Sequence, residues 1–486
     1  MINSLQGISI VLLIAYLVLI LFVVFRSKAS NNAEDYFLAG RKLPFWALSI
    51  TFIASWWGGG SAIDLVNHGF NKGLSSFWIY GMPVLFATFL MYLFASGIRK
   101  VGEITQPQMM EDRYNSTVAL LLSVLILIFM VFGVAIQVVV IGNFFHTFFD
   151  IDYIWAAIMG TLFVLTYSFF GGFRGVVLTD ILQFIFLLIS SVVLFIMIYK
   201  SSGGIDVIRD VAVLHDKPYF FSFFHDWGNN FVYIITFGSS WMIQANIWQR
   251  ISATKNPKEA KSMMSLAFFV FIPLYLLVAF TGMFSTALYD KVPEGGVVIS
   301  YIMDYMPVGL AAIIFVGLCS AIMSTMDSLI NTGAMVLSID VFKKYIGKKA
   351  KPLQMVWVGK ISSLIVTLLG LIVALLIRDM LKVSWIGSDF LATGAFVPIV
   401  MAFLWKKGNS LAATCSIIFG MLFSTYNLLV TLGVNLPVYW EIASVRQALT
   451  GMILSFLIYV LVSCFTCADT TKAVAFIQKS GIVKGN

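Results

Sequence analysis

Long apolar runs separated by short polar segments organise this chain. A run of about twenty apolar residues is long enough to cross the hydrocarbon core of a bilayer as a helix. Thirteen such runs cover 6–25, 44–68, 74–98, 117–145, 152–170, 176–199, 229–247, 263–288, 309–336, 355–377, 385–405, 410–432 and 445–465. The pattern predicts an all-α integral membrane protein with about 13 transmembrane helices.

The composition agrees with this class and argues against several others. Of the 486 residues, 60% are hydrophobic and only 11% are charged, which is typical of a membrane protein. Four cysteines in so long a chain make no disulfide framework. The sequence has neither a GxxxxGK[ST] nucleotide-binding motif nor an HExxH metal motif. We therefore expect neither an ATP-driven pump nor an enzyme.

The basic residues orient the predicted helices. If the N-terminus lies outside and the thirteen runs alternate, 23 of the 31 Lys and Arg residues fall on the inner side. This excess follows the positive-inside rule and faces anionic lipid headgroups, so it does not call for a nucleic-acid partner. We expect the N-terminus out, the C-terminus in, and a multi-pass location in the cell (inner or plasma) membrane.

Two of the runs contain segments that disfavour a continuous helix near mid-membrane. The second run includes Gly58, Gly59 and Gly60, and each glycine costs about 1 kcal/mol relative to alanine in a helix. The seventh run includes the segment FGSSW at 237–241. Matching interruptions in two halves indicate a transporter of inverted repeats with its site at the midplane. Alternatively, these glycines form close-packing faces between helices.

The ninth run places hydroxyl groups and a carboxylate in an otherwise apolar segment. Its centre reads SAIMSTMDS at 320–328. A carboxylate at the middle of a bilayer costs at least ~2.5–3.5 kcal/mol, so it normally serves an ion or a proton. Because small hard cations prefer oxygen ligands, the cluster predicts a cation site. The alternative is that the hydroxyls bond to carbonyls of their own helix.

Four motifs in this order resemble the sodium:solute symporter family, which includes proline, sialic acid, glucose, iodide and choline transporters. They are DYFLAGR at 35–41, YSFFGGFR at 167–174 followed by Thr179-Asp180, WQR at 248–250, and the 320–328 cluster. The resemblance implies Na⁺-coupled secondary active symport of a small organic solute by alternating access. A cation channel or a sensor that uses the same fold is the alternative.

The resemblance also implies a LeuT-type fold with a 5+5 inverted repeat. Within a single transporter domain, 1–486, it assigns a leading helix to 6–25, the first repeat to 44–199 and the second to 229–405. Trailing helices at 410–465 and a cytoplasmic tail at 466–486 complete the chain. The oligomeric state does not follow from the sequence.

The resemblance assigns the main sodium site to the first interrupted helix and to the ninth run. Its ligands would be the carbonyls of Ala54, Trp57 and Ala321 and the hydroxyls of Ser324 and Thr325. Neutral oxygens suit a monovalent cation that must bind and then leave.

A second sodium site, which some members of the family have, would use Asp180, Asp327 and Ser328 together with Ser324. Alternatively, the two carboxylates guide sodium toward the inner side. A further alternative is that Asp180 caps a helix at the interface or pairs with Arg174.

The residues expected to face the solute are Trp56, Ser61, Tyr80, Gln137, Trp241, Gln244 and Asp389. The segment 54–60 looks most like the choline branch, in which an aromatic cage holds a quaternary ammonium. Gln244 and either Phe132 or Gly133 stand where that branch has cage residues. Because no Lys or Arg is expected mid-span in the core, a neutral, zwitterionic or cationic solute is favoured over a strongly anionic one.

Overall fold

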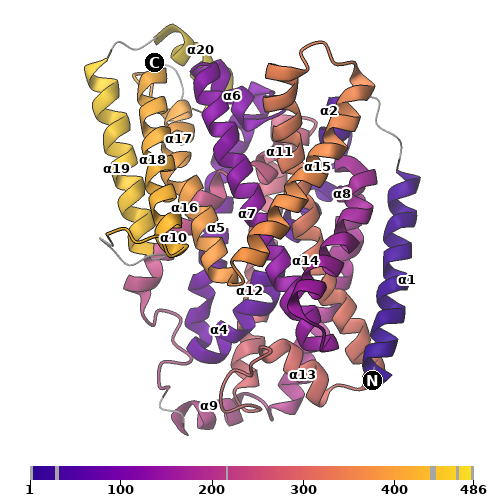
Figure 1. Cartoon of the computed structure of the whole chain (residues 1–486). Helices are drawn as coiled ribbons and strands as arrows, with labels where there is room; N and C mark the ends of the chain where they lie inside the picture. The colour runs from indigo at the N-terminus through magenta and orange to yellow at the C-terminus, as the bar shows by residue number, and fades with distance from the viewer. Residues whose placement is uncertain (1–3, 28–31, 215–216, 438–444, 467–469, 483–486) are drawn as a thin grey trace.

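The structure is a computed structural model that describes all residues except 1–3, 28–31, 215–216, 438–444, 467–469 and 483–486. The described chain forms helices and no strands. Most helices run roughly along one axis, and the two ends of the chain lie at opposite ends of the molecule (Figure 1). This arrangement agrees with an odd number of membrane crossings.

Nine long helices form most of the bundle. They are α1 (Ser4–Arg26), α5 (Phe77–Val101), α7 (Ser116–Phe149), α8 (Tyr153–Ser201), α12 (Pro257–Ser285), α14 (Val308–Val336), α15 (Pro352–Leu376), α18 (Ser410–Thr431) and α19 (Val445–Phe465). Three further crossings are made of shorter pieces: α3 (Phe45–Trp56) with α4 (Leu65–Lys72), α10 (Trp227–Met242) with α11 (Ala245–Ala253), and α16 (Met380–Gly394) with α17 (Phe396–Leu404). Each of the thirteen predicted runs coincides with one of these helical stretches.

One long helix, α8, contains two of the predicted crossings. It covers the runs 152–170 and 176–199, and its backbone leaves helical geometry at Gly172, with φ 53° and ψ −171°. A Cβ atom at this position would lie 2.9 Å from the ring of Tyr36. Gly172 therefore provides both the unusual backbone angle and the space that separate the two crossings.

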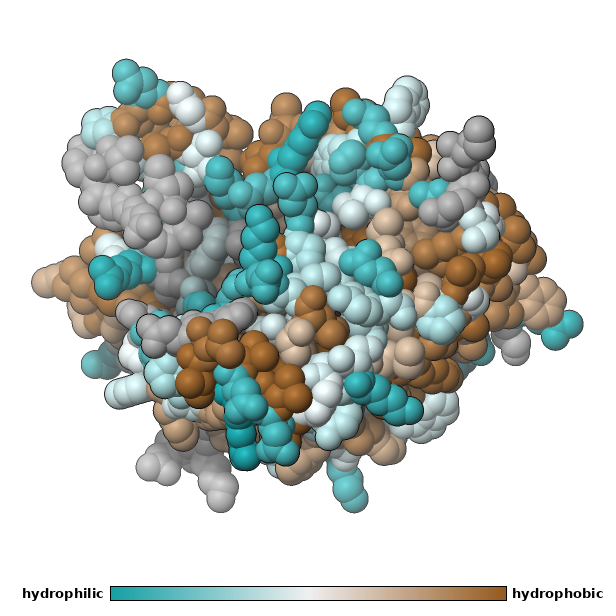
Figure 2. Space-filling view, turned by 90° about the horizontal axis from the view of Figure 1, so that it is seen from below, coloured by the Kyte–Doolittle hydropathy of each residue, from teal (hydrophilic) through white to brown (hydrophobic). Residues whose placement is uncertain are grey.

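Short helices cover the two ends of the bundle. At the C-terminal end lie α2 (Ala33–Leu38), α6 (Gln106–Arg113) and α20 (Thr470–Ser480), whereas α9 (Ile205–Leu214) and α13 (Val297–Tyr305) lie at the other end (Figure 1). Seen from the end with α9 and α13, hydrophilic side chains gather near the middle and hydrophobic ones along much of the rim (Figure 2). This distribution is expected when lipid surrounds the bundle.

The first interruption lies where the glycines predicted it. Helix α3 ends at Trp56, Trp57 has non-helical angles, and a π-helix, η2 (Gly60–Asp64), resumes the crossing. A Cβ on Gly58 would lie 2.2 Å from Thr325 Oγ1, and one on Gly59 would lie 2.6 Å from a methyl carbon of Val140. The glycines therefore also allow α14 and α7 to approach the interruption closely.

The second interruption lies a few residues beyond the predicted segment. Helix α10 continues through Gly238 to Met242, and the backbone becomes extended at Gln244, with φ −62° and ψ 122°. A Cβ on Gly238 would lie 2.6 Å from the ring of Phe86. The prediction of a break at 237–241 is therefore wrong in position, because Gly238 serves close helix packing.

Helix α14 forms the centre of the bundle. Almost every side chain from Ala311 to Val336 is buried, and the helix contacts α1, α3, α7, α8 and α15. A helix that is buried all round must satisfy its polar side chains within the protein. Ser320, Ser324 and Ser328 accordingly contact neighbouring helices, whereas Thr325 bonds the carbonyl of Ala321 on its own helix. A second π-helix, η4 (Leu337–Ile346), extends α14 toward the end of the bundle that carries the C-terminus.

Candidate functional site

A cavity of about 120 Å³ lies beside the two interruptions. Helices α3, α5, α7, α10, α14 and α16 contribute residues to its wall. Six of the seven residues predicted to face the solute line it: Trp56, Ser61, Tyr80, Gln137, Trp241 and Gln244. Residues distant in the sequence are thus brought together where the two interrupted crossings meet.

Three aromatic rings form one wall of this cavity. The centroids of Trp56 and Trp241 are 6.0 Å apart, and Tyr80 stacks on Trp241 with an interplanar angle of 17°. The indole Nε1 of Trp56 donates a hydrogen bond to Gln244 Oε1 at 2.9 Å, which links the two interruptions. The wall therefore offers flat apolar surface held in a fixed orientation.

Polar groups on the cavity wall are uncharged. Gln137 is only 6% exposed, and its Oε1 atom has no hydrogen-bond partner among the described residues. An unpaired buried acceptor costs about 1–3 kcal/mol, so this oxygen is suited to receive a donor from a bound molecule. No Lys, Arg, Asp or Glu is found among the described residues that line the cavity.

Asp389 lies away from the cavity. It is buried, and its Oδ2 atom accepts a hydrogen bond from Asn427 on α18 at 3.2 Å, whereas the preceding residue, Ser388, lines the cavity. The expectation that Asp389 faces the solute therefore disagrees with the structure. The physical reason is helical periodicity, because adjacent residues on α16 point about 100° apart.

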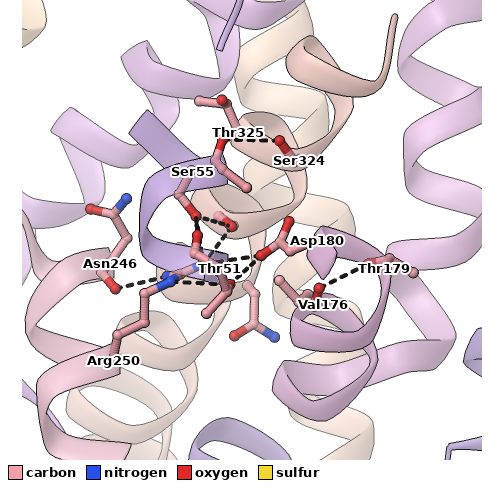
Figure 3. A network of polar contacts seen from close by, with 12 residues as sticks. Thr51, Ser55, Val176, Thr179, Asp180, Asn246, Arg250, Ser324 and Thr325 are labelled. Carbon is pink, nitrogen blue, oxygen red and sulfur yellow. Dashed lines mark hydrogen bonds and ion pairs between the residues drawn. The ribbon is translucent and has the colours of Figure 1, made fainter. Parts of the chain in front are cut away.

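Four of the five residues predicted for the main sodium site meet where α14 touches the first interruption. Ser324 Oγ donates to the carbonyl of Ala54 at 3.0 Å and to that of Ala321 at 3.3 Å. Thr325 Oγ1 donates to the Ala321 carbonyl at 3.2 Å, and Thr325 also lines the cavity. Trp57, the fifth residue, directly follows the end of α3 and is fully buried. Figure 3 shows Ser324 and Thr325 beside the segment of α3 that carries Ser55.

Arg250 on α11 is a functional candidate that the sequence interpretation missed. Its side chain is fully buried, and Nη2 lies 2.6 Å from the hydroxyl of Ser55 and 3.0 Å from that of Thr51 (Figure 3). Nη2 also lies 2.6 Å from the hydroxyl of Ser328. The same atom forms an ion pair with Asp180 at 3.5 Å. The expectation that no basic residue lies in the core is therefore wrong.

A signal for Arg250 was present in the chain. Arg250 ends the WQR motif at 248–250, and it lies only six residues, about 9 Å along a helix, beyond Gln244 in the seventh run. Its long side chain can therefore reach back into the protein instead of extending to the inner surface.

The two carboxylates of the predicted second sodium site have different surroundings. Asp180 accepts a hydrogen bond from Thr51 and pairs with Arg250, so it is neither an interfacial cap nor a partner of Arg174. Asp327 is fully buried, and in the described part of the chain neither of its carboxylate oxygens has a hydrogen-bond partner. Among the described residues, Arg250 forms its ion pair with Asp180, and Asp327 has no ion-pair partner.

The comparison with protein families identifies the chain. The model of the "Sodium:solute symporter family" matches residues 36–420. The sodium/glucose cotransporter of Vibrio parahaemolyticus is 26% identical over 476 residues, covering 87% of this chain and 86% of the relative. A sodium/proline symporter of Staphylococcus aureus is 27% identical over 486 residues, covering 94% and 92%. The sodium/sialic acid symporter of Aliivibrio fischeri is 24% identical, and the match covers 76% of each chain.

Solved structures share the fold. A Na⁺-coupled sialic acid symporter in a substrate-bound outward-open state superposes with a TM-score of 0.78 at 20% identity, covering 95% of this chain and 98% of the other. The nucleobase-cation symporter Mhp1 in a closed conformation gives a TM-score of 0.55 at 11% identity, covering 93% and 99%. These likenesses confirm the LeuT-type fold. The chain belongs to the sodium:solute symporter family and is a membrane protein that couples Na⁺ to the symport of a small solute.

Proposed function

We propose that the main sodium ion binds between the carbonyls of Ala54, Trp57 and Ala321 and the hydroxyls of Ser324 and Thr325. The observation that carries this proposal is the position of Thr325, which contacts the Ala321 carbonyl and also lines the solute cavity. A sodium ion held there would fix the wall against which the solute binds. This arrangement gives a direct physical route for coupling, because each ligand stabilises the surface that the other uses.

We propose a small neutral or zwitterionic solute. The uncharged cavity wall gives an anionic solute no Arg or Lys fork, and Asp389 is not there to attract a cation. Flat faces from Trp56, Trp241 and Tyr80 suit an apolar part of the solute, and the free Gln137 Oε1 suits a hydrogen-bond donor. The similar proteins are named for glucose, sialic acid and proline, so their names do not choose among solutes.

A quaternary-amine solute, as in the choline branch, is the second candidate. Tyr80 and Trp241 stack at the cavity wall and Trp56 lies 6.0 Å from Trp241, so a cation could rest on their π faces. Without an acidic residue in the described lining, this solute would depend on cation–π contacts alone.

We further propose that Asp327 binds a second sodium ion. Its two unpartnered carboxylate oxygens support this role, and Ser324, one turn earlier on α14, would connect the two ions. Asp180 and Ser328 both contact Arg250, which supports a role for them in holding the guanidinium instead of coordinating the ion directly. In this proposal they belong to the same polar network but do not touch the ion.

We propose the inner or plasma membrane as the location, with repeats at 44–199 and 229–405. The predicted excess of basic residues on one side supports the orientation, and the interruptions in the first crossing of each segment support the repeats.

Uptake into proteoliposomes tests the proposed function. We expect solute accumulation above the outside concentration only when a sodium gradient points inward, and none with a potassium gradient. Candidate solutes come from a thermal-shift screen with and without sodium, since a ligand stabilises the folded state by RT ln(1 + [L]/Kd). Stabilisation by dicarboxylates alone would contradict the proposed solute class.

A further inference from the structure

A second, larger cavity lies at the end of the bundle predicted to face the cytoplasm. Its volume is about 360 Å³, three times that of the solute cavity, and α6, α7 and η4 form its walls. Its lining includes Lys343, Lys344 and Lys348 from η4 and the turn after it, and the carboxylates of Glu111 and Asp340. None of these residues contributes to sodium or solute binding as described above.

Among the described residues, only one of the three lysines has an acidic partner. Lys344 Nζ forms an ion pair with Glu111 Oε2 at 2.5 Å. Among the described residues, Lys343 and Lys348 form no ion pair, so two ammonium groups border one cavity without compensation. Two lysines that line the same cavity without an acidic partner are suited to bind the oxygens of a phosphate group.

A buried carboxyl oxygen of Asp340 also needs a hydrogen-bond partner in this cavity. The residue is 5% exposed, and its Oδ1 atom accepts a hydrogen bond from Thr105 at 2.7 Å. Its Oδ2 atom is buried and has no hydrogen-bond partner in the part of the chain that the structure describes. Since a buried carboxyl oxygen without a partner is costly, a molecule in the cavity is expected to supply one. A hydroxyl group can do so whichever protonation state Asp340 has, because it both donates and accepts.

The surroundings place this cavity at the border of the bilayer. Ile346, which lies between Lys344 and Lys348 in the sequence, is 73% exposed, and Leu353 and Trp357 on α15 are 64% and 55% exposed. Exposed apolar side chains beside basic ones are typical of the inner membrane interface, where Lys and Arg meet anionic headgroups.

We propose that this cavity binds a phosphate ester that carries a hydroxyl group, with the phosphate at Lys343 and Lys348 and the hydroxyl at Asp340. The headgroup of phosphatidylglycerol has this chemistry, and a soluble polyol phosphate shares it. Either ligand would join α6 and α7 to η4, the extension of the helix that carries Ser324 and Thr325. Binding is therefore expected to stabilise the whole transporter.

The test measures thermal unfolding of the purified full-length protein in detergent with added phosphatidylglycerol, phosphatidylethanol or phosphatidylethanolamine. Phosphatidylethanol has the same charged phosphodiester without a hydroxyl group. We expect phosphatidylglycerol to raise the unfolding temperature most. Added glycerol phosphate distinguishes a lipid ligand from a soluble one. If glycerol phosphate stabilises the protein as well as phosphatidylglycerol does, the ligand is a soluble polyol phosphate. If glycerol phosphate has no effect, the ligand is the lipid. If phosphatidylethanol or phosphatidylethanolamine stabilises as well as phosphatidylglycerol, the hydroxyl assignment is wrong.

Matched variants test the residues. Lys343→Gln/Lys348→Gln should weaken phosphatidylglycerol binding about tenfold or more, whereas Lys349→Gln/Lys407→Gln, with the same charge change outside the cavity, should not. Asp340→Ala should remove the preference for phosphatidylglycerol over phosphatidylethanol. Thr105→Ala loses the same internal hydrogen bond but keeps Asp340 Oδ2, so it should retain that preference. Equal loss of binding in both lysine pairs would overturn the site.

Discussion

The guanidinium Nη2 of Arg250 lies 2.6 Å from the hydroxyl oxygen of Ser328, a residue predicted to coordinate sodium. The same nitrogen touches Ser55 and Thr51 on α3 and Asp180 on α8. The buried guanidinium of Arg250 therefore connects α11, α3, α8 and α14 on the inner side of the first interruption. This contact ties the inner halves of both interrupted crossings to the helix that carries the proposed sodium ligands.

Arg250→Gln should destabilise the protein strongly, because it leaves Asp180 buried without a counter-charge. Breaking a buried ion pair from one side costs about 3–5 kcal/mol. The double variant Arg250→Gln/Asp180→Asn removes both charges and should recover much of the lost stability. Thermal unfolding in detergent measures both proteins. A double variant less stable than Arg250→Gln would show that this ion pair is not the dominant interaction of Arg250.

Replacing a hydroxyl of the proposed main site should weaken sodium activation. Thr325→Ala or Ser324→Ala removes one oxygen contact to a cation, which is worth about 1.5–3 kcal/mol, or roughly ten- to a hundredfold in sodium affinity. Sodium titration of transport measures the effect. Ser338→Ala is the control, since Ser338 is a buried hydroxyl on the extension of the same helix and hydrogen-bonds Ala334 and Ser362. An unchanged sodium dependence in Thr325→Ala would remove Thr325 from the site.

The outcome for Asp327 depends on how many sodium ions bind. If Asp327 holds a second ion, Asp327→Asn should lower the Hill coefficient for sodium toward one while some transport remains. The wild-type coefficient, measured first by initial uptake rates, is the reference. A wild-type value of one would remove the reason for proposing a second sodium site.

The sequence predicted the fold well because its strongest signals are local. Apolar length located the thirteen crossings, and three consecutive glycines located the first interruption. The second interruption was placed too early, since Gly238 in the sequence does not show whether it bends a helix or packs against Phe86.

The site was predicted less completely because it depends on helix rotation and side-chain reach. Asp389 and Ser388 are adjacent in the sequence, yet only Ser388 faces the cavity. Arg250 ends a motif typical of the family, but its burial results from three other helices that converge on it. Such convergence cannot be derived from the periodicity of a single segment.

A substitution at Trp56 should affect solute binding without affecting sodium binding. Its ring lies at the cavity wall, 6.0 Å from that of Trp241, and its Nε1 donates a hydrogen bond to Gln244 Oε1. Trp56→Ala should remove this wall and leave Gln244 without its partner, so solute-dependent thermal stabilisation should disappear. Sodium-dependent stabilisation should remain, because the proposed ligands on α14 and the carbonyl of Ala54 are unchanged. Trp155→Ala, which removes a tryptophan that is 65% exposed, is the matched control. Solute protection that survives in Trp56→Ala would place the solute elsewhere in the protein.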